Sequence, residues 1–201
     1  MPVHLTCSVC GKSFVRKPAE VKDKNVCSRP CMRAPSPITI GGDGTAMIPL
    51  LARNGDVKAL AIIDAADAAW AGQWRWCLSR AGYAVRNDWS SSRPKMLYLH
   101  RELLGLSPGD GLEGDHINRN KLDNRRSNLR AVTRAGNAQN YPAIAKKSSV
   151  YRGVHLHSPG VWRAKIEVHG KVIHLGLFTD EQQAAEAARA GRARLMPYAT
   201  D

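Results

Sequence analysis

The sequence predicts an α+β chain built from several small modules, and three observations support this class. Four cysteines lie within the first 31 of 201 residues. A Pro-rich linker, Ala34–Pro37, follows them, and strand-type alternation of apolar and polar residues then appears both before and after the polar segment Lys146–Ser149. A hydrophobic content of 43% fits one domain or several, but the cysteines and the periodicities favour several. We therefore expect three parts, at residues 1–34, 38–142 and 148–197.

The N-terminal cysteines follow the pattern C-x2-C-x16-C-x3-C, formed by Cys7, Cys10, Cys27 and Cys31. Four thiolates suit one tetrahedral Zn²⁺, and Gly11-Lys12 after the first pair suits a tight metal-binding knuckle. Disulfides are the weaker alternative for an intracellular chain, and about thirty residues with little apolar content need a staple to fold. The segment is similar to the four-cysteine fingers of phage and bacterial nucleases. We expect structural Zn²⁺ in a finger that binds either DNA or protein.

The second part begins with strand-like runs that predict an antiparallel platform. Trp70, Trp74 and Trp76 are expected in its core, and Cys77 is expected to be a buried thiol. Asp64 signals the start of a short helix at residues 65–71. The expected strands span residues 46–51, 57–63, 74–79, 83–87 and 96–100.

Metal-binding oxygens, an imidazole and arginines gather between residues 114 and 137. Asp115 and Asn137 offer the oxygens that a hard divalent cation prefers, and His116 can take a proton from water at neutral pH. A strand at 112–117, a loop at 118–128, a strand at 129–132 and a helix of about two turns capped by Thr133 would place Asn137 opposite Asp115. The alternative is an Asn- and Arg-rich surface hairpin with an incidental histidine.

The run Gly114-Asp115-His116-Ile117-Asn118, with Asn128 and Asn137 after it, resembles the HNH nuclease family in its phage and homing branch. The resemblance implies a ββα-metal core within residues 100–140. In that core His116 would be the general base, Asp115 and Asn137 would hold the catalytic metal, and Asn128 would orient His116. An all-oxygen site favours Mg²⁺ or Mn²⁺.

The preceding segment also resembles the platform of phage HNH enzymes, in which a Leu-His-Arg sequence comes near the metal. The resemblance implies that His100 contacts the scissile phosphate or its leaving group, while a helix-capping or core histidine is the alternative. Arg101 would bind phosphate, because its planar fork matches two oxygens.

The charge of the chain favours a nucleic-acid partner. Its 30 Lys+Arg against 17 Asp+Glu give a formal charge of +13, which attracts a polyanion and makes binding sensitive to salt. A solvated basic face is the alternative. The basic residues expected to contact phosphate around the motif are Arg119, Arg125, Arg126 and Arg130.

The third part has three strands and one helix. Residues 162–168 alternate apolar and charged, His169-Gly170 suits a hairpin turn into residues 171–178, and residues 151–156 form a preceding strand. Thr179 is expected to cap the helix, with Gln182 at its third position. A small-residue surface for packing on the sheet comes from Ala184, Ala185, Ala187 and Ala188.

This part resembles the AP2 DNA-binding domain in Tyr151-Arg152-Gly153-Val154, Trp162–Ile166, Leu175–Phe178 and the alanine-rich helix. That family lays its three-stranded sheet in the major groove. The alternative is an ordinary sheet-plus-helix module whose polar face meets water. The resemblance places Trp162 and Ile166 against the helix, and its DNA face would carry Arg152, His155, His157, Arg163, Lys165, Glu167 and His174.

Together these features predict a metal-dependent HNH endonuclease that cuts double-stranded DNA, phage-encoded or of homing type. Two alternatives stay open: a non-catalytic, sequence-specific DNA-binding regulator, and a partner-dependent component of phage packaging. The chain has no apolar run of membrane-spanning length and no signal-peptide core. We expect a cytoplasmic protein, in a bacterial host cell if phage-encoded. The oligomeric state is open, but one metal site per chain favours a monomer.

Overall fold

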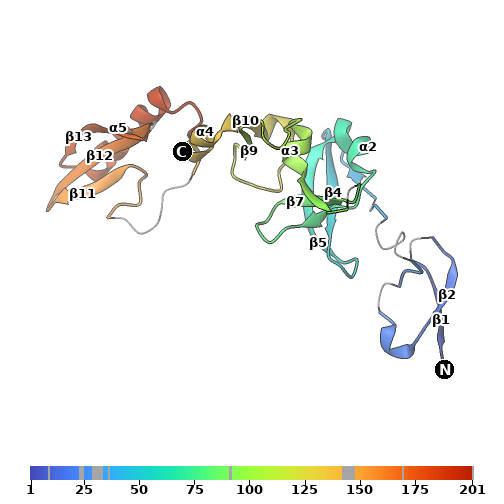
Figure 1. The fold of residues 1–201 in the computed structure, drawn as a ribbon. Coiled ribbons are helices and arrows are strands. Elements are labelled where there is room, and N and C mark those ends of the chain that lie inside the picture. The colour runs from blue at the N-terminus through green and yellow to red at the C-terminus, as the bar shows by residue number, and fades with distance from the viewer. Residues whose placement is uncertain are drawn as a thin grey trace. The chain divides into compact units, whose positions relative to one another are not determined.

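The computed structural model of the chain describes residues 1–8, 10–22, 25–28, 34–35, 37–90, 92–141, 148–168 and 170–200 (Figure 1). Its contacts divide the chain into two compact units. Unit 1 comprises residues 1–106 and 120–130, and unit 2 comprises residues 107–119 and 131–201. The three-part division expected from the sequence stays a prediction.

Several small sheets and a few helices make up the described residues, which confirms the α+β class. None of the described helices has both the length and the apolar character needed to cross a bilayer. The strands are β1 Val3–Thr6, β2 Ser13–Arg16, β3 Thr39–Ile40, β4 Thr45–Leu51, β5 Val57–Asp64, β6 Cys77–Leu78, β7 Ala84–Asp88, β8 Lys95–Tyr98, β9 Leu112–His116, β10 Leu129–Thr133, β11 Val154–Ser158, β12 Val161–Val168 and β13 Lys171–Phe178. The helices are α2 Ala68–Ala71, α3 Leu99–Leu103, α4 Arg134–Gln139 and α5 Glu181–Leu195, with 3-10 turns η1 Pro18–Glu20, η2 Ala65–Asp67 and η3 Arg126–Asn128.

The core of unit 1 lies in the platform, where β3-β4-β5 and β6-β7-β8 form two antiparallel sheets. Alternate residues of β4, such as Ile48 and Leu50, are buried, because a strand sends successive side chains to opposite faces. Trp76 is 1% exposed, and Trp70 and Trp74 pack against the same core. The ring centroids of these three tryptophans lie 5.1–6.5 Å from one another. The prediction of a tryptophan-containing core is confirmed.

Several platform elements differ from the prediction. The strand expected at 74–79 is only Cys77–Leu78, and Cys77 is half-buried rather than buried. The strand expected at 96–100 ends at Tyr98, because Leu99 and Leu103 are spaced four residues apart and bury together on one face of α3.

The helix expected at 65–71 forms as η2 followed by α2. Asp64 is the N-cap residue, as predicted for the start of the helix, although its side chain makes no capping hydrogen bond. Asp64 Oδ2 instead accepts from the backbone N–H of Arg126 at 2.8 Å, and so ties the loop before β10 to the platform.

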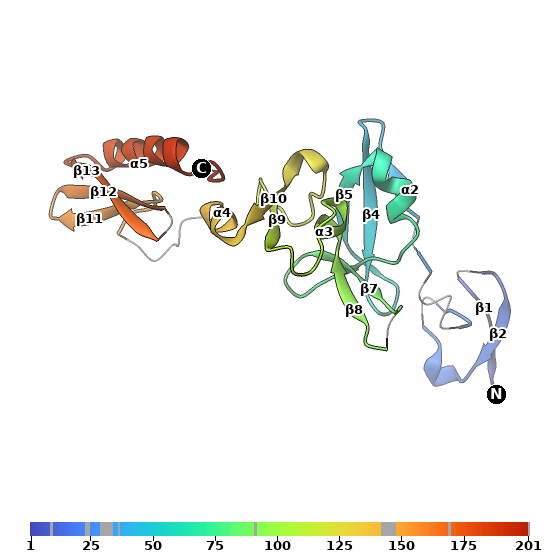
Figure 2. The ribbon, with the colours of Figure 1, turned by 45° about the horizontal axis from the view of Figure 1, so that its top comes forward.

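In unit 2 the antiparallel sheet β11-β12-β13 carries α5 across one face (Figure 2). Ala164, Ile166 and three alanines of α5, Ala184, Ala185 and Ala188, are buried, and the partly buried Trp162 and Ala187 pack against this core, as predicted. Two details are corrected. β11 begins at Val154 rather than Tyr151, and the helix cap is Asp180 rather than Thr179, because Asp180 Oδ1 accepts from Gln183 N–H at 2.8 Å. His169, the first residue of the predicted hairpin turn, lies outside the described residues.

Gly191 of α5 lies close to the Leu175 side chain of β13, and its replacement gives a first prediction. A Cβ at this position would lie 2.6 Å from Leu175 Cδ1. We expect Gly191→Ala to lower the free energy of unfolding by about 1–2 kcal/mol, because overpacking outweighs the gain in helix propensity. Chemical denaturation followed by circular dichroism would measure this. The control is Arg189→Ala on the exposed face of α5, which should change stability by less than about 0.5 kcal/mol; equal stability of both variants would contradict the packing argument.

Candidate active site

The centre of the predicted motif is built from β9 and α4 in unit 2. Thr133 Oγ1 accepts from Gly136 N–H at 3.1 Å, which confirms the predicted cap and fixes where α4 begins. Glu113 and Asp115 are two residues apart on β9 and share one face of the strand. On α4 and its C-cap, Asn137 and Asn140 are three residues apart and share one face of the helix.

Hydrogen bonds join these two faces, and each asparagine contacts one acidic residue of β9. Asn137 Nδ2 donates to Glu113 Oε2 at 2.6 Å. Asn140 Nδ2 lies 3.0 Å from Asp115 Oδ1 and 3.1 Å from Asp115 Oδ2. The sequence predicts Asn137 opposite Asp115, whereas the hydrogen-bond partner of Asn137 is Glu113 and the helix residue that contacts the Asp115 carboxylate is Asn140.

The donor atoms that remain suit a hard divalent cation. Because the amide nitrogen of Asn137 is held by Glu113, the atom that it can offer to a metal is Oδ1. A carboxylate oxygen has more than one lone pair, so the Asp115 carboxylate could contact both Asn140 and a cation. The set consists of oxygens only, which is the preference of Mg²⁺ and Mn²⁺.

His116 ends β9 and is 5% exposed. Its backbone carbonyl accepts from Arg119 N–H at 2.8 Å, which closes a tight turn after the strand. Arg119 takes a φ of 64°, a left-handed conformation that side-chain-bearing residues rarely adopt. His116 directly follows Asp115 in β9, and its sequence-based role as the general base stays a prediction.

Asn128, in unit 1, is 7% exposed and donates from Nδ2 to the backbone carbonyl of Asp123 at 2.7 Å. It therefore holds together the loop that precedes β10. The sequence-based role of orienting His116 stays a prediction.

Two of the arginines expected on phosphate are paired within unit 1. Arg125 donates to both carboxylate oxygens of Asp123, at 2.8 and 2.6 Å, and this hydrogen bonding raises the pKa of Arg125 above its ordinary value. Arg126 donates to both oxygens of Asp67, at 3.0 and 2.8 Å, and its pKa is raised for the same reason. The side chains of Arg125 and Arg126 therefore help to hold the loop before β10 in place. Arg130 is half-buried on β10.

His100 and Arg101 lie in α3 rather than at the end of a strand. The His100 side chain is 6% exposed, with its ring 5.2 Å from that of Tyr83 and 5.6 Å from that of Tyr98. This packing favours the core histidine among the two alternatives. The phosphate contact expected for Arg101 stays a prediction.

On the C-terminal sheet, the face away from α5 carries most of the residues predicted to read DNA. Arg163 is paired in register with His155, and Lys165 with His174, so each pair shares that face. Glu167 and His157 are exposed. Arg152 differs from this prediction, because its Nη2 donates to the backbone carbonyl of Gln139 at 2.7 Å.

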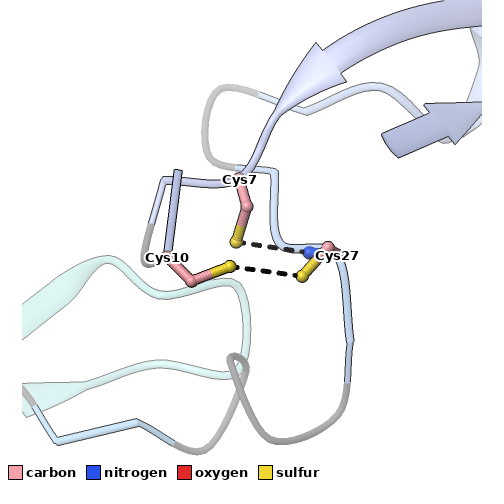
Figure 3. Close-up of side chains that lie close together, drawn as sticks. All are labelled: Cys7, Cys10 and Cys27. Carbon is pink, nitrogen blue, oxygen red and sulfur yellow. Dashed lines mark hydrogen bonds between the residues drawn. The ribbon is translucent and has the colours of Figure 1, made fainter. Parts of the chain in front are cut away.

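The N-terminal segment brings three of the four predicted zinc ligands together (Figure 3). The sulfurs of Cys7, Cys10 and Cys27 all lie within 4.8 Å of one another, which suits thiolates around one Zn²⁺. Cys7 Sγ accepts from Cys27 N–H, and Gly11 N–H donates to the Cys7 carbonyl, closing the knuckle. Cys31, the fourth predicted ligand, lies outside the described residues.

A second prediction concerns this cysteine cluster. We expect purified protein to carry about one Zn²⁺ per chain, and Cys10→Ser to lose it to a chelator far more readily, because one thiolate ligand is removed. Cys77→Ser is the control, because Cys77 lies outside the cluster. Zinc released to a chromophoric chelator would be followed over time, and identical release from both variants would argue against the site.

Sequence reasoning missed Glu113 and Asn140. Neither residue type is unusual in this stretch, and only the pairing of β9 with α4 gives them partners. The signal available in advance was spacing, because each lies on the same face of its element as a predicted ligand: Glu113 two residues before Asp115, and Asn140 three residues after Asn137.

Comparison with known proteins agrees with this geometry. Residues 101–139 match the HNH endonuclease family. A protein of Acanthamoeba polyphaga mimivirus, described as an uncharacterized HNH endonuclease, is 29% identical over 114 residues, which is 57% of this chain and 58% of that protein. No solved structure gives a significant match.

Proposed function

We propose that this protein is a metal-dependent endonuclease that hydrolyses phosphodiester bonds of double-stranded DNA. The observation that carries the proposal is the hydrogen bonding between β9 and α4, which joins Asn137 to Glu113 and Asn140 to Asp115, and the buried His116 follows Asp115 in the chain. The similarity of residues 101–139 to the HNH endonuclease family supports a nuclease. A phage or homing origin is part of the same proposal.

In this mechanism His116 takes a proton from a water molecule, which then attacks the phosphorus in line with the leaving 3′ oxygen. Asp115 and Asn137 would hold a Mg²⁺ or Mn²⁺ ion, which when bound stabilises negative charge on the phosphate and on the leaving oxygen. Glu113 accepts a hydrogen bond from the amide nitrogen of Asn137, so the amide oxygen Oδ1 would be the atom that binds the metal.

DNA would be positioned by the outer face of β11-β12-β13, with Arg163, Lys165 and His174 toward the groove or the phosphates. The net charge of +13 supports binding to a polyanion, with an affinity that falls steeply as salt rises. The finger would add a further contact, to DNA or to protein. A monomer with one site would nick one strand at a time.

The experiment that tests the proposal is incubation of supercoiled plasmid with purified protein and Mg²⁺ or Mn²⁺, with a chelator control. We expect conversion to open circles with metal and none with chelator. Retardation of the DNA without nicking would instead favour a DNA-binding regulator, and nicking that needs added phage proteins would favour a packaging component.

A further inference from the structure

Asn140 makes several hydrogen bonds in the candidate active site. It is 3% exposed, and its Nδ2 lies within hydrogen-bond distance of both Asp115 carboxylate oxygens, of the His116 carbonyl at 3.0 Å and of the Ile117 carbonyl at 3.3 Å. One amide group thus contacts the predicted metal ligand and the backbone of the predicted general base. A shift of Asn140 would move both.

The other end of the same amide is held by the C-terminal segment. Asn140 Oδ1 accepts from the hydroxyl of Thr200, and Arg119 Nε approaches the same oxygen at 3.4 Å. Arg119 in turn donates from Nη2 to the hydroxyl of Thr200 at 3.0 Å. Because oxygen acceptors surround Nδ2 and donors surround Oδ1, the amide has one favourable orientation.

This arrangement accounts for the unusual backbone of Arg119. Its left-handed φ places the guanidinium against Thr200 and Asn140, at the end of the turn that starts at His116. Strain of this kind costs of order 1–3 kcal/mol and persists where the surrounding contacts enforce it. Arg119 joins the C-terminal segment to the candidate active site, and the phosphate contact predicted for it from the sequence stays a prediction.

We propose that Asn140 is a positioning residue that orients the Asp115 carboxylate for metal binding, and that Thr200 holds Asn140 in place. This inference rests on the proposed function, because it assumes that Asp115 binds the metal. Residues that hold a metal ligand in place commonly change metal affinity or activity by about 10- to 100-fold when they are replaced. Residue 200 would then belong to the catalytic module although it follows the C-terminal sheet and helix.

The test compares Asn140→Leu with the wild type in Mn²⁺ binding, read as the loss of the free-ion EPR signal during titration. We expect the dissociation constant for Mn²⁺ to rise by about tenfold or more, because leucine keeps the volume but removes the donor to Asp115. The matched control is Gln139→Ala. Gln139 is a neighbouring buried amide that accepts from Tyr198 N–H, and so also anchors the C-terminal segment to α4, but no hydrogen bond described here joins it to Asp115.

A second variant keeps the test decisive if Asn140→Leu fails to fold. Thr200→Val removes the hydroxyl that holds Asn140 while keeping the shape of the side chain. It should weaken Mn²⁺ binding by about two- to tenfold, the loss expected for one hydrogen bond. An unchanged dissociation constant in both variants, or an equal rise in Gln139→Ala, would overturn the inference. A wild type that neither binds Mn²⁺ nor nicks DNA would instead contradict the proposed function itself.

Discussion

Replacing His116 with alanine is expected to lower the first-order rate of plasmid nicking by about 10²- to 10⁴-fold, the contribution typical of a general base. His116 follows Asp115 directly, is almost fully buried, and its carbonyl is fixed by Arg119 and Asn140. Mn²⁺ binding should change little, because the proposed ligands Asp115 and Asn137 remain. The rate would be measured with excess protein over supercoiled plasmid, so that binding does not limit it.

The control for this variant is His4→Ala, which removes an exposed histidine from β1 in the N-terminal segment. It should nick at the wild-type rate. If the His116→Ala variant also nicks at that rate, the assignment of the general base is wrong.

Replacing Asp115 with asparagine is expected to weaken Mn²⁺ binding strongly and to lower the rate of nicking by about 10²-fold or more. The change removes the charge of the proposed ligand. It also sets an amide against Asn140 Nδ2, which lies near both carboxylate oxygens, so an N–H group would face another N–H group. Titration of Mn²⁺ and the nicking rate would both be measured.

Glu113→Gln is the matched control for Asp115→Asn. It removes the same charge from the same face of β9, yet a glutamine oxygen can still accept from Asn137 Nδ2. We expect a loss of rate of less than about tenfold, the value of one weakened hydrogen bond. Equal losses in the two variants would indicate a general effect of charge rather than metal ligation by Asp115.

The parts of the fold that were predicted correctly are those set by local patterns. β13 has the predicted bounds, β12 starts one residue early, and Thr133 caps α4 as expected, because alternation and capping depend on residues close in sequence. Thr179 and Asp180 are both residue types that cap helices, and the local pattern does not distinguish them. In the structure Asp180 caps α5. α3 was missed because its five residues are too short for a helical period to stand out.

The candidate site depends even more on contacts between residues that are distant in sequence. The motif predicted Asp115, His116 and Asn137 from their types and spacing, but the partners that hold them come from packing. Asn140 gains its role only when α4 lies against β9 and Thr200 returns from 60 residues away. Arg126 likewise pairs with Asp67, which is 59 residues distant. No local pattern predicts such contacts.

The most direct test of the proposed nuclease is the rate of nicking of supercoiled plasmid in Mg²⁺ and in Mn²⁺ by the wild type beside His116→Ala, both purified in the same way. We expect open circles from the wild type, no product with chelator, and a rate at least about 10²-fold lower for the variant. Equal nicking by both proteins, or binding of plasmid by the wild type with no nick under any of these conditions, would contradict it.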